Sequence, residues 1–498
     1  MNLAGQLLER IAEATNPNER ARLRCQLAKE LQDAGDYEGA RSAMGELWQR
    51  IGERPRLEGL DEAARAEVLL RAGALTGWIG SAKQFEGAQD KAKDLITEAM
   101  TLFGAVDDAE KLDECQLEIA LCHWRQGAFD DARDMLHRVL DRLADSESES
   151  KLVAVVRSAI NERSAMRYHD ALRIQTEYAP LFGENVSHAL RAKFHNEFGI
   201  VLDILGTSER REDYIDRALL EYTAASYHFE QAGHLRYCAC VENNLAMLYL
   251  AVGRFKEAHE HLDRARPIFV RLKDEVHTAQ LDETRSKVLL AEGRNAEAER
   301  TAGAAVRTLE KGGEQSLLAE ALTAHGTALA RTGRHVRARL TLQRAVVIAE
   351  RAGDTETAGR ALLAVVEELY EQTPRGELFT LYEQAAEHLA NSQQPNMAAR
   401  LVSDALLVLR VLKPQTPEDV PADWQGFSLR EAVRRYEGMI IERALKDAGG
   451  VVTRAAQLLG LKHYQTLISL LNSRHRELLR DRTPILPRRR SIVKKPDE

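Results

Sequence analysis

Residues 253–258 read Gly-Arg-Phe-Lys-Glu-Ala, and the pattern returns as Gly-Arg-Asn-Ala-Glu-Ala at 293–298 and as Gly-Arg-His-Val-Arg-Ala at 333–338. The closing alanines of the three copies follow one another at intervals of 40 residues. A fixed period of this length is the signature of a repeat architecture, in which every unit is one small supersecondary element. This unit therefore decides the fold of the region in which it recurs.

The same unit recurs upstream in copies that end at Ala40, Ala88 and Ala132, and weaker copies end at Ala171 and Ala218. The larger gaps of 48 residues after Ala40 and 47 residues after Ala171 predict longer helices and inserted loops, one of them over residues 206–213. We expect about nine helical pairs between residue 1 and about residue 412, with a degenerate last pair around Glu367 to Ala390.

Each unit is predicted to be two helices joined at the glycine. Leu245 and Tyr249 continue the apolar stripe of a first helix, and Leu262 and Ala265 continue that of a second at helical spacing. Gly253 is expected between them, because glycine ends a helix in the left-handed conformation without a side-chain penalty. One such pair cannot bury its apolar face alone, so the pairs must stack on one another.

The unit resembles the tetratricopeptide repeat. The matching small, aromatic and glycine positions are Ala246, Tyr249, Gly253, Phe255, Ala258 and Ala265. The period is about 40 residues here, whereas the family has 34. The resemblance implies that residues 1–412 form an all-α solenoid of antiparallel helix pairs, which binds a protein or peptide partner on its concave face.

Three asparagines on the first helices of their repeats are candidates for that concave face: Asn196, Asn243 and Asn244. An amide side chain there can bond the backbone of an extended peptide. The alternative is that each is a structural or solvent-facing amide. Residues 413–427 then break the helical pattern with three prolines, and we interpret them as an extended linker.

Residues 428–480 predict three further helices. Ser428 is a candidate N-cap of the first, which Gly449-Gly450 ends. Thr453 is expected to cap the second, and Ala456 with Gly460 to permit a close helix crossing. The third is expected to expose its polar residues while Leu467, Leu470 and Leu471 face inward. This order of helices is the plan of a helix-turn-helix.

The run Gly-Gly-Val-Val-Thr-Arg-Ala-Ala-Gln-Leu-Leu-Gly at 449–460 resembles the Fis-type helix-turn-helix of bacterial regulators. Two departures are Val451, where the family is often polar, and Thr466 in place of a leucine, with Leu467 one position later. The resemblance implies a sequence-specific transcriptional regulator whose third helix enters the major groove of double-stranded DNA. The implied DNA-binding residues are Thr453, Arg454, Lys462, His463, Tyr464, Gln465, Ser469, Arg474 and Arg476.

The distribution of charge supports this assignment. The whole chain has a formal charge of -8, from 69 Lys and Arg against 77 Asp and Glu. Residues 428–498 hold 16 Lys and Arg against 8 Asp and Glu, which leaves 53 against 69 for residues 1–427. Any contact with nucleic acid is therefore expected at the basic C-terminal end. The tail at 481–498 fits either an arm along phosphates or a solubilising segment.

An apolar stripe on the first helix of this region can pack within the domain or against a second copy. It contains Leu429, Val433, Tyr436, Ile440, Ile441 and Leu445. Because one helix-turn-helix contacts a short half-site, we expect a homodimer with its seam on this helix. The alternative function is an interaction scaffold whose C-terminal hairpin does not bind DNA.

Other sequence features exclude function classes. Five scattered cysteines (Cys25, Cys115, Cys122, Cys238 and Cys240) make no disulfide framework, so a reduced cytoplasm is expected. A signal peptide and an apolar run long enough for a membrane are lacking. With no phosphate loop, nucleophile elbow or zinc-protease motif, we expect neither an enzyme nor a cofactor. His234, Cys238 and Cys240 match no standard zinc spacing, which favours core cysteines over a metal site.

Overall fold

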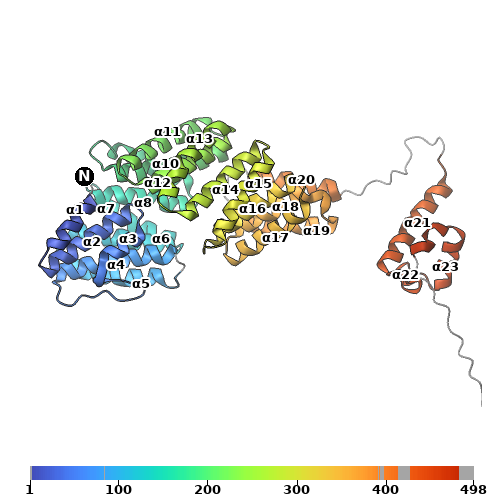
Figure 1. Cartoon of the computed structure of the whole chain (residues 1–498), viewed down its shortest axis with the longest axis horizontal. Helices are drawn as coiled ribbons and strands as arrows, with labels where there is room; N and C mark the ends of the chain where they lie inside the picture. Colours follow the sequence, from blue (N-terminus) through green and yellow to red (C-terminus); the bar gives the residue numbers. More distant parts are fainter. Residues whose placement is uncertain (1–2, 83–84, 391, 393–396, 413–426, 482–498) are drawn as a thin grey trace, which may run out of the picture. The chain divides into compact units, whose positions relative to one another are not determined.

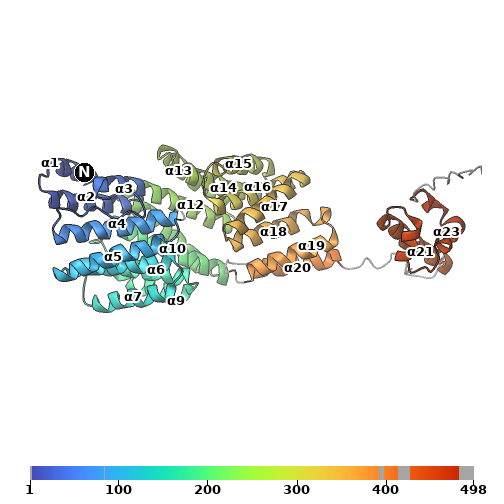
Figure 2. The same cartoon turned by 90° about the horizontal axis from the view of Figure 1, so that it is seen from below.

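The computed structural model describes residues 3–82, 85–390, 392, 397–412 and 427–481, and these residues contain helices and connections but no strand. The chain divides into two compact units, 1–412 and 413–498 (Figures 1 and 2). The predicted linker at 413–427 and the predicted basic tail at 481–498 lie outside the described residues, apart from Phe427 and Asp481. None of the described helices is long and apolar enough to cross a membrane.

The first unit is an array of α-helices. They are α1 (Leu3–Glu13), α2 (Pro17–Asp33), α3 (Tyr37–Met44), α4 (Glu62–Ala82), α5 (Ala88–Ala105), α6 (Ala109–Arg125), α7 (Phe129–Arg142), α8 (Glu149–Ser164), α9 (Tyr168–Tyr178), α10 (His188–Glu209), α11 (Glu212–Gln231), α12 (Leu235–Ala251), α13 (Phe255–Arg271), α14 (Glu275–Ala291), α15 (Asn295–Leu309), α16 (Gln315–Arg331), α17 (His335–Arg351), α18 (Thr355–Leu369), α19 (Arg375–Leu389) and α20 (Met397–Leu412).

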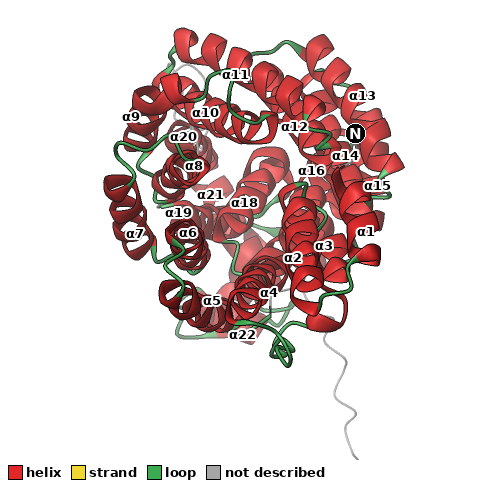
Figure 3. Cartoon of the chain, turned by 90° about the vertical axis from the view of Figure 1, so that its left-hand side faces the viewer, coloured by secondary structure: helices red, strands yellow, loops and turns green. Residues whose placement is uncertain are grey.

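These helices form the predicted solenoid. Consecutive pairs run from α2/α3 to α18/α19, with α1 before them and α20 after them, so the expected nine pairs are confirmed for the described residues. The even-numbered helix of each pair faces the inside of the superhelix and the odd-numbered helix lies outside. Figure 3 shows this clearly for α6, α8 and α10, which lie inside α7, α9 and α11.

The repeated small residues position the helices as expected. Ala258, Ala298 and Ala338 are completely buried where the two helices of a pair meet. Gly253 has a φ of 75°, which an L side chain rarely adopts, and it ends α12 one residue before Arg254 caps α13. At the turn before α9 the same conformation is taken by Met166, with a φ of 61°. The pair therefore forms there without the glycine that marks the stronger repeats.

The prediction of an inserted loop at 206–213 is wrong. Helix α10 continues through Glu209, and α11 begins at Glu212. The extra residues of this repeat are absorbed by longer helices of 22 and 20 residues. Gly206 lies inside α10, and the position requires glycine because a Cβ there would lie 2.7 Å from Ile215 Cδ1. Its glycine marks a close helix–helix approach, although a glycine in a polar run resembles a loop signal in sequence.

The early repeats close upon themselves through side chains of the α2–α3 turn. Asp33 Oδ1 lies 3.1 Å from Lys193 Nζ on α10, and the Tyr37 and Tyr237 hydroxyls are 3.1 Å apart. The Tyr37 ring also stacks on Trp78 of α4, with ring centroids 5.1 Å apart. The first pair thus contacts the fifth and sixth pairs, so α2 to α13 make one closed superhelical turn. We call these three contacts of Asp33 and Tyr37 with Lys193, Tyr237 and Trp78 the closing contact.

The second unit contains three α-helices in its described part. They are α21 (Leu429–Asp447), α22 (Val452–Leu458) and α23 (Tyr464–Ser473), followed by a short 3-10 helix over Arg476–Asp481. Their buried core consists of aliphatic residues from all three helices, among them Ile441, Leu445, Ala456, Leu467 and Leu471. This small domain therefore has its own core.

Candidate nucleic-acid interface

The ends of α21 follow the local signals in the sequence. The Ser428 hydroxyl accepts a hydrogen bond from the Glu431 amide at 3.3 Å, so the predicted N-cap is confirmed. At the other end Gly449 and Gly450 have φ values of 62° and 77°. The Gly450 amide donates to the Leu445 carbonyl at 2.8 Å, which satisfies one of the last free carbonyls of the helix. These two glycines turn the chain back toward α22.

The predicted cap of α22 is wrong by two residues. The helix begins at Val452, its N-cap is Val451, and no side chain caps it. Thr453 and Arg454 are therefore the second and third residues of the helix, and both are exposed. The apolar Val451 at the cap position leaves the first amides of α22 without a side-chain acceptor. These amides and the Arg454 guanidinium are consequently available to an anion.

The turn between α22 and α23 also differs from the prediction in one respect. Gly460 has a φ of 66°, and a Cβ there would meet nothing within 4 Å. Its function is to turn the chain after α22, where the Leu461 amide donates to the Ala456 carbonyl at 2.9 Å. The close crossing instead uses Ala455 and Ala456, which are both buried in the domain core.

Helix α23 begins at Tyr464, with His463 as its N-cap and Lys462 in the preceding turn. Leu467 is completely buried and Thr466 is exposed, so the core leucine occupies the displaced position that the sequence indicated. Leu471 is buried and Leu470 is partly buried. The side chains of Lys462, His463, Tyr464, Gln465 and Ser469 are all exposed, as predicted.

The exposed residues divide into unpaired and paired groups. Within residues 427–481, the side chains of Arg454, Lys462 and Gln465 have no hydrogen bond or ion pair. Arg474 lies 3.5 Å from Glu437, and Arg476 Nε donates to the Asn472 carbonyl at 2.7 Å. The two C-terminal arginines are thus engaged within the domain, whereas the first three side chains point to solvent without a partner.

His475, in contrast to its basic neighbours, belongs to the interior. It is 1% exposed, and its Nε2 lies 3.0 Å from Glu437 Oε2. Gly438 makes room for the ring, since a Cβ there would approach His475 Nδ1 at 3.1 Å. The hydrogen bond with His475 lowers the pKa of Glu437 against the opposing effect of burial, and the charge of Arg474 adds to the lowering. This contact fastens the end of α23 to α21.

The apolar stripe of α21 is divided by the fold. Ile441 and Leu445 are buried in the domain core. Four further residues remain exposed by 42% to 68%: Leu429, Val433, Tyr436 and Ile440. These four follow the spacing of one helix face. An apolar face that the second unit itself leaves uncovered is a candidate contact surface.

The predicted groove residues of the solenoid lie on two neighbouring inner helices. Asn244 Nδ2 donates to Asn196 Oδ1 at 3.4 Å, which brings α12 and α10 together. Asn243 Oδ1 is buried and has no partner among the described residues. Lys193 and Tyr237 are spaced three and seven residues from this pair, on the same helix faces. The faces that carry Asn196 and Asn244 therefore also carry the closing contact.

The structure places no metal site at the cysteines. In the described part of the chain, no group of three or more His, Cys, Asp and Glu side chains is arranged to hold a metal ion. All five cysteines are free thiols, and Cys238 lies 3.5 Å from the Ser226 hydroxyl. Burial raises the pKa of the Cys238 thiol. These residues fill the core of the helix pairs.

One feature of the solenoid has no counterpart in the sequence predictions. A pocket of about 410 Å³ lies on the inner faces of α14, α16, α18 and α20. Its residues span Leu250 to Arg400, and every basic residue in it belongs to a different helix. The sequence shows which charged residues share the inner face of one repeat. It does not show which of them become neighbours when several repeats stack, so the pocket could not be predicted from it.

Comparison with known proteins assigns the C-terminal domain to a family. Residues 432–467 match the family described as "Bacterial regulatory protein, Fis family". No curated protein matches the sequence of the chain.

Similar solved structures include a Rap protein complexed with Competence and Sporulation Factor. It is 14% identical, covers 75% of this chain and 99% of its own, and has a TM-score of 0.46. A signal-transduction ATPase with a tetratricopeptide repeat sensor from Pyrococcus horikoshii is 10% identical over 82% and 68% of the two chains, with a TM-score of 0.48. Because these likenesses are distant, the repeat assignment depends on the helix pairs of the chain itself. The chain thus combines a solenoid of tetratricopeptide-like helix pairs with a Fis-family helix-turn-helix domain at residues 432–467.

Proposed function

We propose that this protein is a sequence-specific DNA-binding transcriptional regulator. Its solenoid binds a protein or peptide, and its α23 docks in the DNA major groove. The observation that carries the proposal is a set of exposed polar side chains at the start of α22 and α23 that have no partner within residues 427–481: Arg454, Lys462 and Gln465. In a helix-turn-helix the start of the second helix of the motif reads base edges.

The candidate residues separate by chemistry. Arg454 and Lys462 are cations at helix starts, where phosphates bind, so they position the domain on the DNA backbone. Gln465 can make two hydrogen bonds to adenine, and His463, Tyr464 and Ser469 project from the same turn and helix. Thr453 supplies a hydroxyl beside Arg454. Arg474 and Arg476 contribute positive charge while they remain bonded within the domain.

Affinity for DNA requires two copies of the domain in this proposal. The exposed face of α21 that contains Val433 and Tyr436 is the proposed seam of a homodimer. A dimer places two recognition helices about one turn of DNA apart, roughly 34 Å. The same apolar face gives the domain a reason to pair, because its exposed side chains would leave water.

The solenoid acts in this proposal by binding and without catalysis or a cofactor. Its concave face includes the inner helices on which Asn196, Asn243 and Asn244 lie. The protein then works in the cytoplasm of a bacterium, where a partner of the solenoid alters the action of the DNA-binding end. A scaffold with a C-terminal hairpin that does not bind DNA is the competing function.

DNA binding is tested by a mobility-shift titration of the full chain against a library of genomic fragments. We expect Arg454→Ala and Lys462→Ala to weaken binding about tenfold each and to lower the salt slope by about 0.9. Arg443→Ala is the matched control, because Arg443 is exposed on α21 and pairs only with Asp447 in the described region. Absence of binding by the wild-type chain at low salt would favour the scaffold.

The seam is tested by the molar mass of the full chain in light scattering. Tyr436→Glu should convert a dimer into a monomer, because it places a charge within the proposed contact. Leu458→Glu is the control, since Leu458 is an equally exposed apolar residue that lies on α22. A wild-type chain that is monomeric on DNA as well as in solution would contradict this seam.

A further inference from the structure

A second pocket lies within the first repeat. It has a volume of about 230 Å³ and is formed by residues 17–24 of α2 and by residues 46–60 of the connection between α3 and α4. This connection is part of the long interval of 48 residues between Ala40 and Ala88. We call this pocket the edge pocket, because it lies where an outer helix connects to the next inner helix.

The connection that covers the edge pocket is tied to the fold. Trp48 is 2% exposed, and its indole Nε1 donates to the Glu53 carbonyl at 3.2 Å. The Arg56 amide donates to the Leu47 carbonyl at 2.9 Å. Leu60 is buried in the core of the first repeats. The segment that carries Arg56 is therefore held on both sides.

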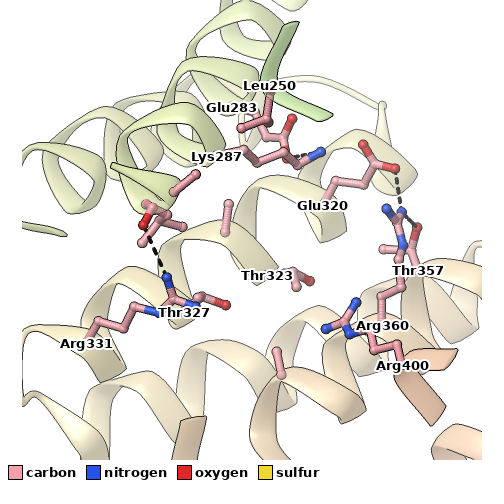
Figure 4. Close-up of a pocket in the computed structure, with 14 residues that line it drawn as sticks. Leu250, Glu283, Lys287, Glu320, Thr323, Thr327, Arg331, Thr357, Arg360 and Arg400 are labelled. Carbon is pink, nitrogen blue, oxygen red and sulfur yellow. Dashed lines mark hydrogen bonds and ion pairs between the residues drawn. The ribbon is translucent and has the colours of Figure 1, made fainter. Parts of the chain in front are cut away.

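Both signs of charge line the edge pocket without pairing. Its charged residues are Arg20, Arg24, Arg56, Glu46 and Glu58. None of these side chains forms an ion pair with any residue that the structure describes. The cations in the pocket of α14 to α20, in contrast, are all held by carboxylates, as Figure 4 shows for Arg360 with Glu320.

Two of the arginines are held in place by backbone carbonyls. Arg20 donates to the Ala14 carbonyl through Nε at 3.1 Å and through Nη2 at 2.6 Å. Arg24 Nη1 donates to the Ala43 carbonyl at 3.0 Å. Gly45 makes room for this guanidinium, since a Cβ there would lie 2.5 Å from Arg24 Nη1. A carbonyl carries no full charge, so both guanidiniums are positioned while their charges remain uncompensated.

Donors remain free on these arginines. Arg24 Nε is buried and has no partner among the described residues. A buried N–H without an acceptor destabilises a fold, so this donor indicates that an acceptor belongs beside it. A guanidinium has five N–H donors, of which Arg20 uses two and Arg24 uses one. The Arg56 side chain has no hydrogen bond in the described part of the chain.

We propose that the edge pocket binds a small zwitterion with two negative charges and one ammonium group, of which a free acidic amino acid is the simplest case. The guanidiniums bind the anionic groups, and Glu46 and Glu58 accept hydrogen bonds from the ammonium group. The lining has one positive charge in excess, with three Arg and two Glu, and the ligand has one negative charge in excess. Pocket and ligand therefore match in total charge and in the placement of both signs.

The size and apolar part of the edge pocket also fit such a molecule. Its volume is below the range of about 300 to 1,000 Å³ that is typical of pockets for drug-sized ligands. Pro17, Ala21, Leu47 and Leu60 can contact the few methylene groups of an amino acid. A simple inorganic anion would use the arginines but leave both carboxylates without a partner, and a row of phosphates would be repelled by them.

The test is isothermal titration calorimetry of the full chain with L-glutamate and L-aspartate. We expect at least one to bind, and both L-glutamine and N-acetyl-L-glutamate to bind at least about tenfold more weakly, because each lacks one charged group that the pocket bonds. Phosphoethanolamine carries its two negative charges on a phosphate. Tighter binding of phosphoethanolamine than of both amino acids would support the proposal and identify phosphate as the source of the anionic charge.

Two variants of the connection test the assignment of residues. Arg56→Gln and Glu58→Gln should each weaken binding of the amino acid at least about tenfold. Glu58→Gln should leave the affinity for N-acetyl-L-glutamate undiminished, because that probe has no ammonium group to lose. Arg138→Gln on α7 and Glu383→Gln on α19 are the matched controls, since both residues are exposed and have no ion pair in the described region.

Several outcomes would overturn the proposal: no binding of the two amino acids or of phosphoethanolamine, inorganic phosphate that binds as tightly as they do, or equal affinities of the Arg56 and Arg138 variants. Circular dichroism melting of each variant separates lost binding from lost folding. The edge pocket is independent of the proposed DNA binding. Arg56→Gln should therefore leave mobility shifts of DNA intact, and Lys462→Ala should leave binding of the amino acid intact.

Discussion

The inner faces of the early and the late repeats carry ion pairs of similar geometry in opposite surroundings. In the early repeats Arg71 lies 2.8 Å from Glu114, and its side chain is only 2% exposed. In the late repeats Arg400 lies 2.7 Å from Glu367, with side chains 36% and 29% exposed. The early repeats, which close through Asp33 and Tyr37, contain the buried pair. The same kind of repeat can therefore hold its inner charges either buried in the packed interior or open to water.

The energetic consequence follows from desolvation. A buried ion that loses its partner keeps the full cost of removal from water, whereas an exposed ion is hydrated again. The Arg71–Glu114 pair, with a guanidinium that is 2% exposed, is therefore structural. The Arg400–Glu367 pair of the late repeats is hydrated and should contribute less to stability.

The largest effect is expected from Arg71→Met. Removal of the guanidinium leaves the largely buried Glu114 with Lys111 as its remaining partner, so the unfolding free energy should fall by about 3 kcal/mol. Arg400→Met should cost less than about 1 kcal/mol, because its pair is open to water. Urea unfolding followed by circular dichroism measures both. Equal losses in the two variants would show that burial does not separate the early from the late ions.

Acid should weaken the early repeats through Glu114. Burial acts to raise the pKa of Glu114, but the charges of Arg71 and Lys111 outweigh burial and lower the pKa to about 2. Because the folded pKa lies below the ordinary 4.5, this stabilisation is present above about pH 4.5 and is lost as the pH falls toward 2. The loss is about 3 kcal/mol. Glu114→Gln should flatten the pH dependence of the urea midpoint across this window, and an unchanged dependence would contradict the assignment.

Base should have the opposite effect on the late repeats, through Asp404. Burial, followed by the neighbouring charge of Glu367, raises the pKa of Asp404 against the lowering effect of Arg400. Since the folded pKa lies above the ordinary 3.8, the stabilisation is present below that value and is lost as the pH rises through the raised pKa. Asp404→Asn should therefore stabilise the chain at about pH 8 by on the order of 2 kcal/mol. A destabilised variant, measured by urea unfolding at that pH, would reverse this sign.

Opening of the closing contact should have a moderate effect. Lys193→Ala combined with Tyr237→Phe removes a half-exposed ion pair and a hydrogen bond, so we expect a loss of about 1–2 kcal/mol. Hydrogen exchange should accelerate in the α2–α3 turn. Lys256→Ala is the control, because its pair with Glu260 lies on the outer helix α13. Unchanged exchange at residues 33–37 would mean that these contacts do not hold the turn closed.

The smallest effect is expected at a turn. Met166 has a φ of 61° and is half exposed, whereas the late copies place glycine at the same position of the repeat. Met166→Gly relieves the left-handed strain of an L residue and should raise the unfolding free energy by about 0.5–1 kcal/mol. Gly253→Met should make the reverse change in a late repeat. Thermal unfolding of the two single variants is the measurement.

Local features of the fold could be predicted because they depend on neighbours in sequence. The spacing of Gly253 and Ala258 requires a helix, a left-handed turn and a close crossing, whichever repeat follows. Leu467 was identifiable as the core leucine of α23 because it is the leucine next to the expected position, one residue later than in the family pattern. The cap of α22 was misplaced because Thr453 is a strong N-cap type, yet Val451 occupies that position without any side-chain bond.

Contacts between distant repeats could not be predicted in this way. Tyr37 and Tyr237 are 200 residues apart, and their contact depends on the accumulated rotation of every intervening pair. The pocket on the inner faces of α14, α16, α18 and α20 likewise unites Leu250 with Arg400. A small change in the rotation per repeat would move these residues past one another without altering any helix.

The sequence by itself determined the repeat, the number of helix pairs, the helix-turn-helix and the basic character of the C-terminal end. Each of these follows from periodicity and local backbone preference, which act over a few residues. Only the tertiary structure decided that the early turn closes, that Arg71 is buried, and that cations from α14, α16, α18 and α20 line one pocket. These outcomes depend on how the pairs stack, because superhelical curvature is the sum of many small rotations that no single repeat specifies.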